Sequence, residues 1–580
     1  MTAVATVSTE RGHWLDRYAN DYHRWRLEKD QSGNASWIRR QGVVEQGFDT
    51  DGRYYGGRAD VNTLLRLKAS SAISPEQLQQ RILLAWTVLR LEHVLLRAAA
   101  PIMTDSSEVA EPYFRVSCFN SSEEAIEDAQ KCLVHVKDRR GRPVNDDEFY
   151  HHVVNTARVV DPNGSLSKLF VLPPKLSISG HVVLRFFFVV AHSVTDGLTM
   201  RVWLESFLRL INSPLHDLQT AVESLGTTVA TKPRLPLAQE DLYPQISGSL
   251  ARRRWFWCLS RVLRHVRRSL PAAFPNPLRR DQPFPDSRLY PPVYSDVLDY
   301  SSKPPLNTFY VRATVNSKAR DRLVSICRQV GASVGAGGFA LVALVMMILN
   351  ERRNPGDQRP FMTGFPLNPR PFFNHMDPPD SMMLAFSDGI VLPFLPSHLD
   401  LEGRFRILVR HAQRQLSSFQ KRARPEDTRD PLWYVGSRGP GRVIAINYLA
   451  TVEKEQAKLP VERRNAVNGP QGSLEARPNE SSQTCGVSSV GRTTQKPGMY
   501  DLKKPIGKNE DDFVADWFDA RSSVRVRDDE FLCGVTGHDD GLELGVSVDG
   551  NAIDEKRADE WKHLIETIFD DEQDQVRPRL

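Results

Sequence analysis

The most restrictive feature of the sequence is a long apolar run that ends in a histidine-containing turn. Residues 181–191 read HVVLRFFFVVA, and this run of β-branched and aromatic residues is typical of a buried strand. The next six residues, from His192 to Gly197, have the pattern HxxxDG. A helix is then indicated by apolar residues at helical spacing, namely Leu204, Phe207, Leu208 and Ile211. The sequence therefore predicts a buried strand, a short connection that carries HxxxDG, and an amphipathic helix.

The length of the chain predicts two lobes, because 580 residues exceed what one hydrophobic core supports. A net charge of +5, from 76 basic and 71 acidic residues, is too mild for a dedicated nucleic-acid binder. The six cysteines lie far apart without a CxxC pair, which argues against a disulfide scaffold or a thiolate zinc site. HExxH and P-loop patterns are also absent, so we expect neither a metal nor a bound cofactor.

The sequence offers little to hold the chain in a membrane. Its first residues, MTAVATVSTERGHW, contain no apolar signal segment. Residues 330–349 are uncharged, but only residues 339–349 are densely apolar, which is too short to span a bilayer. We therefore expect a buried helix there, no integral membrane association and a cytoplasmic location.

The composition divides the chain into three ranges. We expect an N-terminal lobe over residues 1–212, a crossover rich in Pro, Arg and Asp over residues 213–300, and a C-terminal lobe over residues 301–580. In the N-terminal lobe, Ser74 and Gln77 form a capping box at the start of a helix. In the C-terminal lobe, the pattern predicts strands at 308–315, 361–367, 389–394, 442–449 and 542–548, and a helix at 554–569. The polar residues 453–512 predict a long insertion.

Two further segments have competing interpretations. Residues 335–340 match the dinucleotide fingerprint GxGxxA, but the residues before them look helical, so a loop between two packed helices is the preferred interpretation. Residues 251–268, ARRRWFWCLSRVLRHVRR, form a basic amphipathic helix that could lie on an anionic membrane or attract the phosphates of coenzyme A. We favour a crossover helix whose apolar stripe packs on the body. The stripe consists of Trp255, Leu259, Val262, Leu263 and Val266.

The HxxxDG motif itself suggests acid–base chemistry. His192 can take a proton from a hydroxyl group during attack on an acyl carbon. Asp196 could hold the connection in shape, and Gly197 would allow a close backbone approach or a positive φ. The alternative is a structural histidine beside a capping aspartate.

The surroundings of this motif resemble acyltransferases related to chloramphenicol acetyltransferase. That superfamily includes plant BAHD acyltransferases, condensation domains of peptide synthetases and fungal alcohol acetyltransferases. Three other segments resemble family elements in the expected order: residues 84–98 (LAWTVLRLEHVLLRA), 364–370 (GFPLNPR) and 488–491 (SSVG). Among the members, the acetyltransferases of fungal trichothecene and related toxin pathways look most similar.

The resemblance implies an α/β fold of two chloramphenicol-acetyltransferase-like lobes with mixed sheets and an active-site tunnel between them. It makes His192 the general base and Asp196 its structural partner. Arg370 matches a family arginine that pairs with this aspartate across the lobes; the alternative is a surface arginine. Ser488 or Ser489 could donate a hydrogen bond to the oxyanion, or could simply shape a turn.

Two departures from the family patterns refine the expected function. Ala191 stands where condensation domains have a first histidine, and the BAHD segment DFGWG is absent. We therefore expect an O-acyltransferase that uses acetyl-CoA or another acyl-CoA as co-substrate and a small-molecule alcohol, a fungal secondary metabolite, as acceptor. The alternatives are a condensation-like enzyme that takes its acyl group from a carrier protein, a non-catalytic relative, and a nucleotide-dependent oxidoreductase.

Overall fold

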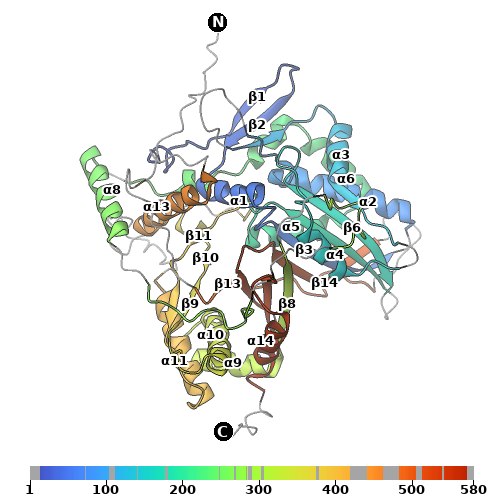
Figure 1. Ribbon diagram of the computed structural model, residues 1–580. Coiled ribbons are helices and arrows are strands. Elements are labelled where there is room, and N and C mark those ends of the chain that lie inside the picture. Colours follow the sequence, from blue (N-terminus) through green and yellow to red (C-terminus); the bar gives the residue numbers. More distant parts are fainter. Residues whose placement is uncertain are drawn as a thin grey trace.

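Two mixed β-sheets, each covered by its own helices, organise the molecule (Figure 1). They are seen in a computed structural model of the chain, in which each sheet has its own large hydrophobic core. The structure describes residues 14–71, 73–102, 112–139, 142–176, 181–246, 248–266, 270–282, 284, 290–301, 306–373, 378–418, 440–461, 470, 483–503, 513–538 and 541–570.

The first sheet is built around the strand that the apolar run predicts. This strand, β7 (Val182–Val190), is buried along almost its whole length. Its one charged residue, Arg185, donates hydrogen bonds to the carbonyl oxygens of Val144 and Pro173, both at 2.9 Å, and pairs with Asp146. The strand order is β14 (Phe513–Val524), β3 (Val61–Ser71), β7, β6 (Ser167–Leu176) and β5 (Leu133–His135). All pairs in this sheet are antiparallel except β5 with β6.

Helices of the N-terminal half cover this sheet. The capping box predicted at Ser74 and Gln77 is confirmed, and it starts the longest of these helices. The helices are α2 (Pro75–Glu92), α3 (Ser122–Lys131), α4 (Asp146–Asn155), α5 (Gly197–Ile211) and α6 (Leu215–Leu225). Helix α5 follows β7 directly and buries the apolar face expected from its sequence, so the predicted strand–turn–helix unit is confirmed.

The second sheet lies in the C-terminal half. Its order is β12 (Ile390–Leu392), β9 (Phe361–Gly364), β13 (Cys485–Arg492), β15 (Phe531–Gly537), β16 (Leu542–Asp549) and β8 (Thr308–Val315). Strand β13 is parallel to both of its neighbours, and the other pairs are antiparallel. The covering helices are α9 (Ser317–Gln329), α10 (Val334–Arg353), α11 (Leu401–Leu416) and α14 (Glu555–Thr567).

Helix α10 is long and apolar enough to cross a membrane, but 78% of its apolar window is buried inside the protein. Its side chains from Phe339 to Met347 form the centre of the second core. The glycine-rich residues 335–340 are the first turns of this helix rather than a loop, and α9 precedes them, so no strand stands directly before Gly335. A Cβ on Gly338 would lie 2.8 Å from Val535, which shows that this glycine allows the helix to approach the sheet closely.

The chain crosses between the two halves. Strand β14 lies within residues 301–580, yet it pairs with β3 in the first sheet over its whole length. A third group of helices lies beside both sheets: α1 (Val43–Tyr54), α8 (Leu250–His265) and α13 (Pro440–Lys458) (Figure 1). The described residues also form two smaller sheets. One has three strands, β1 (Arg26–Lys29), β2 (Ala35–Arg40) and β4 (Tyr113–Ser117). The other has two strands, β10 (Pro366–Leu367) and β11 (Ala385–Phe386).

Two sequence predictions are wrong in this region. Residues 442–449, expected as a strand, belong to helix α13, whose buried side chains Ile444, Ala445, Tyr448, Leu449 and Val452 recur at helical spacing. Residues 453–512, expected as an insertion, include the end of α13 and the central strand β13. The short polar strand β13 lacks the apolar run that marks a buried strand, and residues 462–469, 471–482 and 504–512 lie outside the described part.

Candidate active site

His192 lies in the short connection between β7 and α5, so its backbone is fixed by the strand before it and the helix after it. Part of the residue surface remains accessible. Burial lowers the pKa of His192 below its ordinary value of 6.5, while its own backbone carbonyl and the charge of Asp196 act in the opposite direction. The imidazole is therefore neutral at physiological pH, which is the form that can accept a proton.

The ring of His192 is stacked on a phenylalanine from another element. Phe48 of α1 lies parallel to it, with ring centroids 4.0 Å apart and an interplanar angle of 7°. Phe48 is buried, so the stack fixes one face of the imidazole. Nδ1 of His192 is buried and meets no hydrogen-bond acceptor in good geometry among the described residues. The orientation of the ring thus depends on packing against Phe48 more than on a hydrogen bond.

The carboxylate of Asp196 accepts hydrogen bonds from backbone N–H groups and none from His192, although both residues belong to the same motif. It is the N-cap of α5, and its Oδ1 accepts hydrogen bonds from the backbone N–H groups of Leu198 and Thr199, both at 2.9 Å. Its Oδ2 accepts from the backbone N–H of Met383 at 3.0 Å. The carboxylate is therefore engaged in structural contacts.

Arg370 completes these contacts from the C-terminal half of the chain. Its Nη2 lies 2.7 Å from Oδ2 of Asp196, and both side chains are more than nine-tenths buried. The same nitrogen donates to the carbonyl oxygen of Ser381 at 2.5 Å and to Oγ1 of Thr199 at 3.1 Å. The structure thus brings together the two residues that the resemblance pairs, and it joins the two halves at the start of α5.

A second contact between the halves involves His93, the histidine of the segment 84–98. Its Nδ1 lies 2.6 Å from Oδ1 of Asp380, and its Nε2 lies 3.0 Å from Oγ of Ser206 on α5. Trp203 donates to the same oxygen of Asp380 at 2.9 Å. Residues 380–383 therefore dock on α5 through Asp380, Ser381 and Met383.

Gly197 and the two candidate serines lie where α5 meets β13. A Cβ on Gly197 would stand 3.5 Å from Cγ1 of Val490, an ordinary contact, and Gly197 has no positive φ. Neither the expected positive φ nor an unusually close backbone approach is therefore seen at Gly197. Ser489 points to α10, because its Oγ lies 3.4 Å from the Cβ position of Gly335. Ser488 lies on the opposite face of the strand, since successive side chains alternate.

A network of charged side chains lies beside Phe48. Arg527 lies over the Phe48 ring at 5.9 Å and donates to Asp51 of α1 at 2.7 Å. Lys458 of α13 also donates to Asp51, at 3.0 Å. These two cations hold the pKa of the Asp51 carboxyl well below its usual range in spite of burial. The positive charge of Arg527 also favours neutral His192.

Sequence reasoning missed Phe48, Asp51 and Arg527. Helix α1 carries glycine and several acidic residues instead of an apolar run, so its pattern contains no strong signal. Arg527 lies in the connection between β14 and β15, where a single arginine has no distinguishing neighbours.

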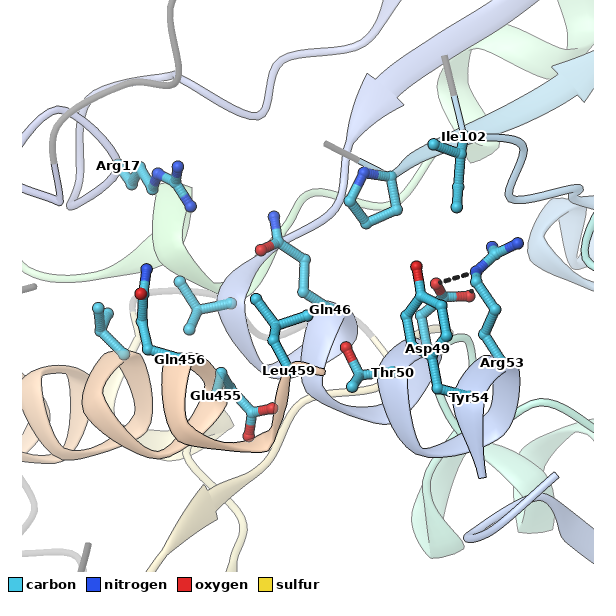
Figure 2. Close-up of a pocket in the computed structure, with 13 residues that line it drawn as sticks. Arg17, Gln46, Asp49, Thr50, Arg53, Tyr54, Ile102, Glu455, Gln456 and Leu459 are labelled. Atoms are coloured by element: carbon cyan, nitrogen blue, oxygen red, sulfur yellow. Dashed lines mark hydrogen bonds and ion pairs between the residues drawn. The ribbon is translucent and has the colours of Figure 1, made fainter. Parts of the chain in front are cut away.

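A small cavity lies on the other side of α1 (Figure 2). It is lined by side chains of α1, among them Gln46, Asp49 and Arg53, and by Glu455 and Gln456 of α13. Its volume of about 60 Å³ suffices for a few water molecules and not for an organic substrate. Because Phe48 faces His192 from the opposite side of α1, this cavity is separate from the candidate active site.

A larger cavity of about 470 Å³ opens at the N-terminal end of α10. Ser489 of β13 lines it together with Gly335 of α10. Its wall contains the basic residues Arg320, Arg328, Arg492 and His538 and the acidic residue Asp321. Strand β13 therefore borders this basic cavity through Ser489 and contacts the HxxxDG connection through Val490.

The sequence matches no family model and no curated protein. Solved structures resemble it over almost its full length. The trichothecene 15-O-acetyltransferase TRI3 from Fusarium sporotrichioides superposes with a TM-score of 0.59 at 13% identity, over 94% of this chain and 96% of that one. The chain has the two-lobed chloramphenicol-acetyltransferase-like fold. The condensation domain of the monacolin K polyketide synthase MokA also superposes, with a TM-score of 0.50 at 9% identity, over 92% of this chain and 96% of that one.

This fold explains the arrangement of the two mixed sheets. The lobes meet where β13 approaches the start of α5, and His192 stands beside that junction. An acyltransferase-type fold is thereby established.

Proposed function

We propose that this protein is an O-acyltransferase that moves an acyl group from an acyl thioester, acetyl-CoA in the first place, to a hydroxyl group of a small alcohol. The geometry of His192 supports this proposal most directly. Its imidazole is held neutral by burial and clamped by Phe48, while Asp196 of the same motif is bound to Arg370. A neutral, positioned imidazole is the requirement for a general base.

In the proposed reaction, His192 takes the proton of the acceptor hydroxyl as its oxygen attacks the thioester carbonyl carbon. A C–O bond forms, and the carbonyl electrons move to the oxygen to give a tetrahedral oxyanion. When this intermediate collapses, the C–S bond breaks and the thiolate takes the proton back from the imidazolium. The products are an ester and a free thiol, and His192 is regenerated as a neutral base.

The basic cavity beside α10 supports an acyl-CoA donor. Guanidinium groups bind phosphates well, and the cavity presents Arg328 next to the strand that reaches the HxxxDG connection. We therefore assign the phosphates of coenzyme A to this cavity. Arg328→Gln should raise KM for acetyl-CoA and leave KM for acetyl-pantetheine unchanged, because the latter lacks the nucleotide. Arg414→Gln, on the exposed surface of α11, is the matched control.

The decisive test is a thiol-release assay with acetyl-CoA and a panel of sterically varied alcohols, with His192→Ala alongside. Acceptor-dependent release that disappears in the variant supports the proposal. Since the MokA condensation domain shares the fold, a loaded carrier protein is included as a second donor. Turnover with the carrier and none with acetyl-CoA would favour a condensation-like enzyme, and failure with both donors would favour a non-catalytic relative.

The acceptor is proposed to be a secondary metabolite. The resemblance to TRI3, a trichothecene 15-O-acetyltransferase, motivates terpenoid alcohols as the first members of the panel. Polyketide alcohols follow as the second group.

A further inference from the structure

Helix α8 is anchored to the protein by one face. Trp257 packs edge-on against Trp14 and Tyr18, with ring centroids 5.2 Å and 4.9 Å away. Nε of Arg264 lies 3.2 Å from Oε2 of Glu453 on α13, and both side chains are buried. These contacts hold the helix firmly at the edge of the molecule, beside α13 (Figure 1).

The opposite face of α8 carries an apolar stripe that faces solvent. Trp255 is 66% exposed, and Leu259, Val262 and Val266 are 40%, 50% and 63% exposed. Their spacing of four, three and four residues places them on one side of the helix. The expectation that this stripe packs on the body is therefore wrong, because Trp257, Ser260 and Arg264 form the packed face instead.

The charges of α8 have one sign. Arg252, Arg253 and Arg254 are all exposed at the beginning of the helix. The helix sequence, LARRRWFWCLSRVLRH, contains no acidic residue. Arg252 lies one turn before Trp255, so a basic side chain stands at the edge of the apolar stripe.

We propose that α8 is a peripheral docking helix that binds an anionic lipid surface. The apolar stripe would enter the boundary between headgroups and acyl chains, where tryptophan is favoured, and the arginines would contact the anionic headgroups. A second copy of the chain is a poorer occupant, because pairing two α8 helices would bring arginines of like charge together. The inference is independent of the chemistry at His192.

Because α8 is fixed to the body, lipid binding would orient the whole protein. The face that carries Trp257 must point away from the membrane, since it is packed against Trp14 and Tyr18. The protein would therefore lie on the surface without inserting its cores. Such a position would give it access to acceptors that partition into membranes.

Co-sedimentation with lipid vesicles tests the proposal. The full chain is expected to sediment with vesicles of phosphatidylcholine and phosphatidylserine and to remain in solution with phosphatidylcholine alone. The double variant Arg252→Gln/Arg254→Gln should lower the partition coefficient about twenty-five-fold, at about fivefold for each arginine. Arg410→Gln/Arg414→Gln, two exposed arginines one turn apart on α11, is the charge-matched control and should bind like the wild type.

The apolar contribution needs its own pair of variants. Trp255→Ser/Val262→Ser removes exposed apolar surface from the stripe and should lower partitioning about tenfold or more. Leu176→Ser/Val229→Ser removes side chains that are 83% and 84% exposed elsewhere, and it should have no effect. Thermal unfolding of all four variants should match the wild type, because none of these side chains is buried.

A fluorophore reports directly on immersion of the helix. Cys258 lies on α8 and is exposed, whereas the other five cysteines are buried or partly buried. With Cys118 replaced by Ser, an environment-sensitive dye on Cys258 should shift to shorter wavelength with anionic vesicles only. Equal binding to neutral vesicles, unchanged binding of the α8 variants, or a dye shift caused by self-association without lipid would each overturn the proposal.

Discussion

Arg370 and Asp196 are 174 residues apart in the chain and form a buried ion pair of 2.7 Å between the two halves of the molecule. Asp196 also accepts three backbone hydrogen bonds, so every part of its carboxylate is engaged. The aspartate of the HxxxDG motif therefore positions the helix that follows His192. This assignment of roles separates the expected effects of the two motif residues.

Loss of either partner of this pair should destabilise the fold. Arg370→Ala leaves the Asp196 charge buried without its cation, and Asp196→Asn leaves Arg370 without its anion. We expect the free energy of unfolding to fall by about 3–5 kcal/mol in each case, measured by urea denaturation followed by circular dichroism. Activity should fall together with stability. A large loss of rate at unchanged stability would show that Asp196 acts directly in the reaction.

His192→Ala should lower activity without lowering stability, in contrast to the variants of the ion pair. We expect kcat to fall by about 10²–10⁴-fold, the usual contribution of a general base, with little change in the melting temperature. In the wild type, kcat/KM should rise with pH as His192 loses its proton and level off, with a midpoint below 6.5 because burial lowers the pKa of this residue. A midpoint clearly above 6.5 would contradict the assigned environment of the ring.

The structure shows why the sequence predicted some of these features and not others. Strand β7, the HxxxDG turn and α5 are consecutive, so their apolar periodicity and motif spacing are visible in one stretch of sequence. The Arg370 contact became visible only through the resemblance of GFPLNPR to a family segment. A long-range ion pair leaves no periodic trace of its own.

The errors have a common physical cause. The short apolar run at 442–449 fits a strand or a buried helix, and only the contacts of Ile444 and Tyr448 with the third helical group decide between them. Strand β13 is central, yet its serine and glycine residues make it look like a loop. The solvent exposure of the α8 stripe depends on which face of the helix meets α13, and spacing alone cannot decide that.

Ser488 and Ser489 should be separable by mutation. Ser489 faces the cavity at α10, whereas Ser488 faces the other side of β13. If a serine donates to the oxyanion, Ser488→Ala should lower kcat about 10²-fold and Ser489→Ala should leave it near the wild-type value. Steady-state kinetics with a saturating donor checks this. A larger loss of kcat in Ser489→Ala than in Ser488→Ala would contradict this prediction and place the oxyanion contact on the face of β13 towards α10.

Phe48 is expected to be a positioning residue for His192. Phe48→Leu keeps an apolar side chain of similar size but removes the flat surface on which the imidazole lies. We expect kcat to fall about tenfold with KM for both substrates nearly unchanged, because a small displacement of a reacting group is costly. Phe386→Leu, whose ring is 6.3 Å from that of Phe48 and is not stacked on His192, is the control. Equal effects of the two variants would indicate a general packing defect.

Glu240 should make the stability of the protein fall as pH rises from 4.5 to about 8. Its Oε1 accepts a hydrogen bond from the backbone N–H of Val43 at 2.8 Å, at the start of α1. Burial, and then the nearby charge of Glu45, raise the pKa of Glu240 from 4.5 to about 8. The folded protein therefore holds a proton that the unfolded chain releases above pH 4.5.

Since the folded state binds more protons in this window, the free energy of unfolding should fall as pH rises towards 8, by at most about 1.4 kcal/mol per pH unit. Asp241, whose pKa is raised to about 6, contributes in the same direction at lower pH. Urea denaturation of the wild type and of a Glu240 variant between pH 6.5 and 8.5 compares the two proteins where Glu240 titrates. Glu240→Gln keeps an acceptor for Val43 and cannot titrate, so its stability should fall less steeply than that of the wild type. Identical pH profiles of the two proteins would mean that Glu240 is already ionised in the folded state.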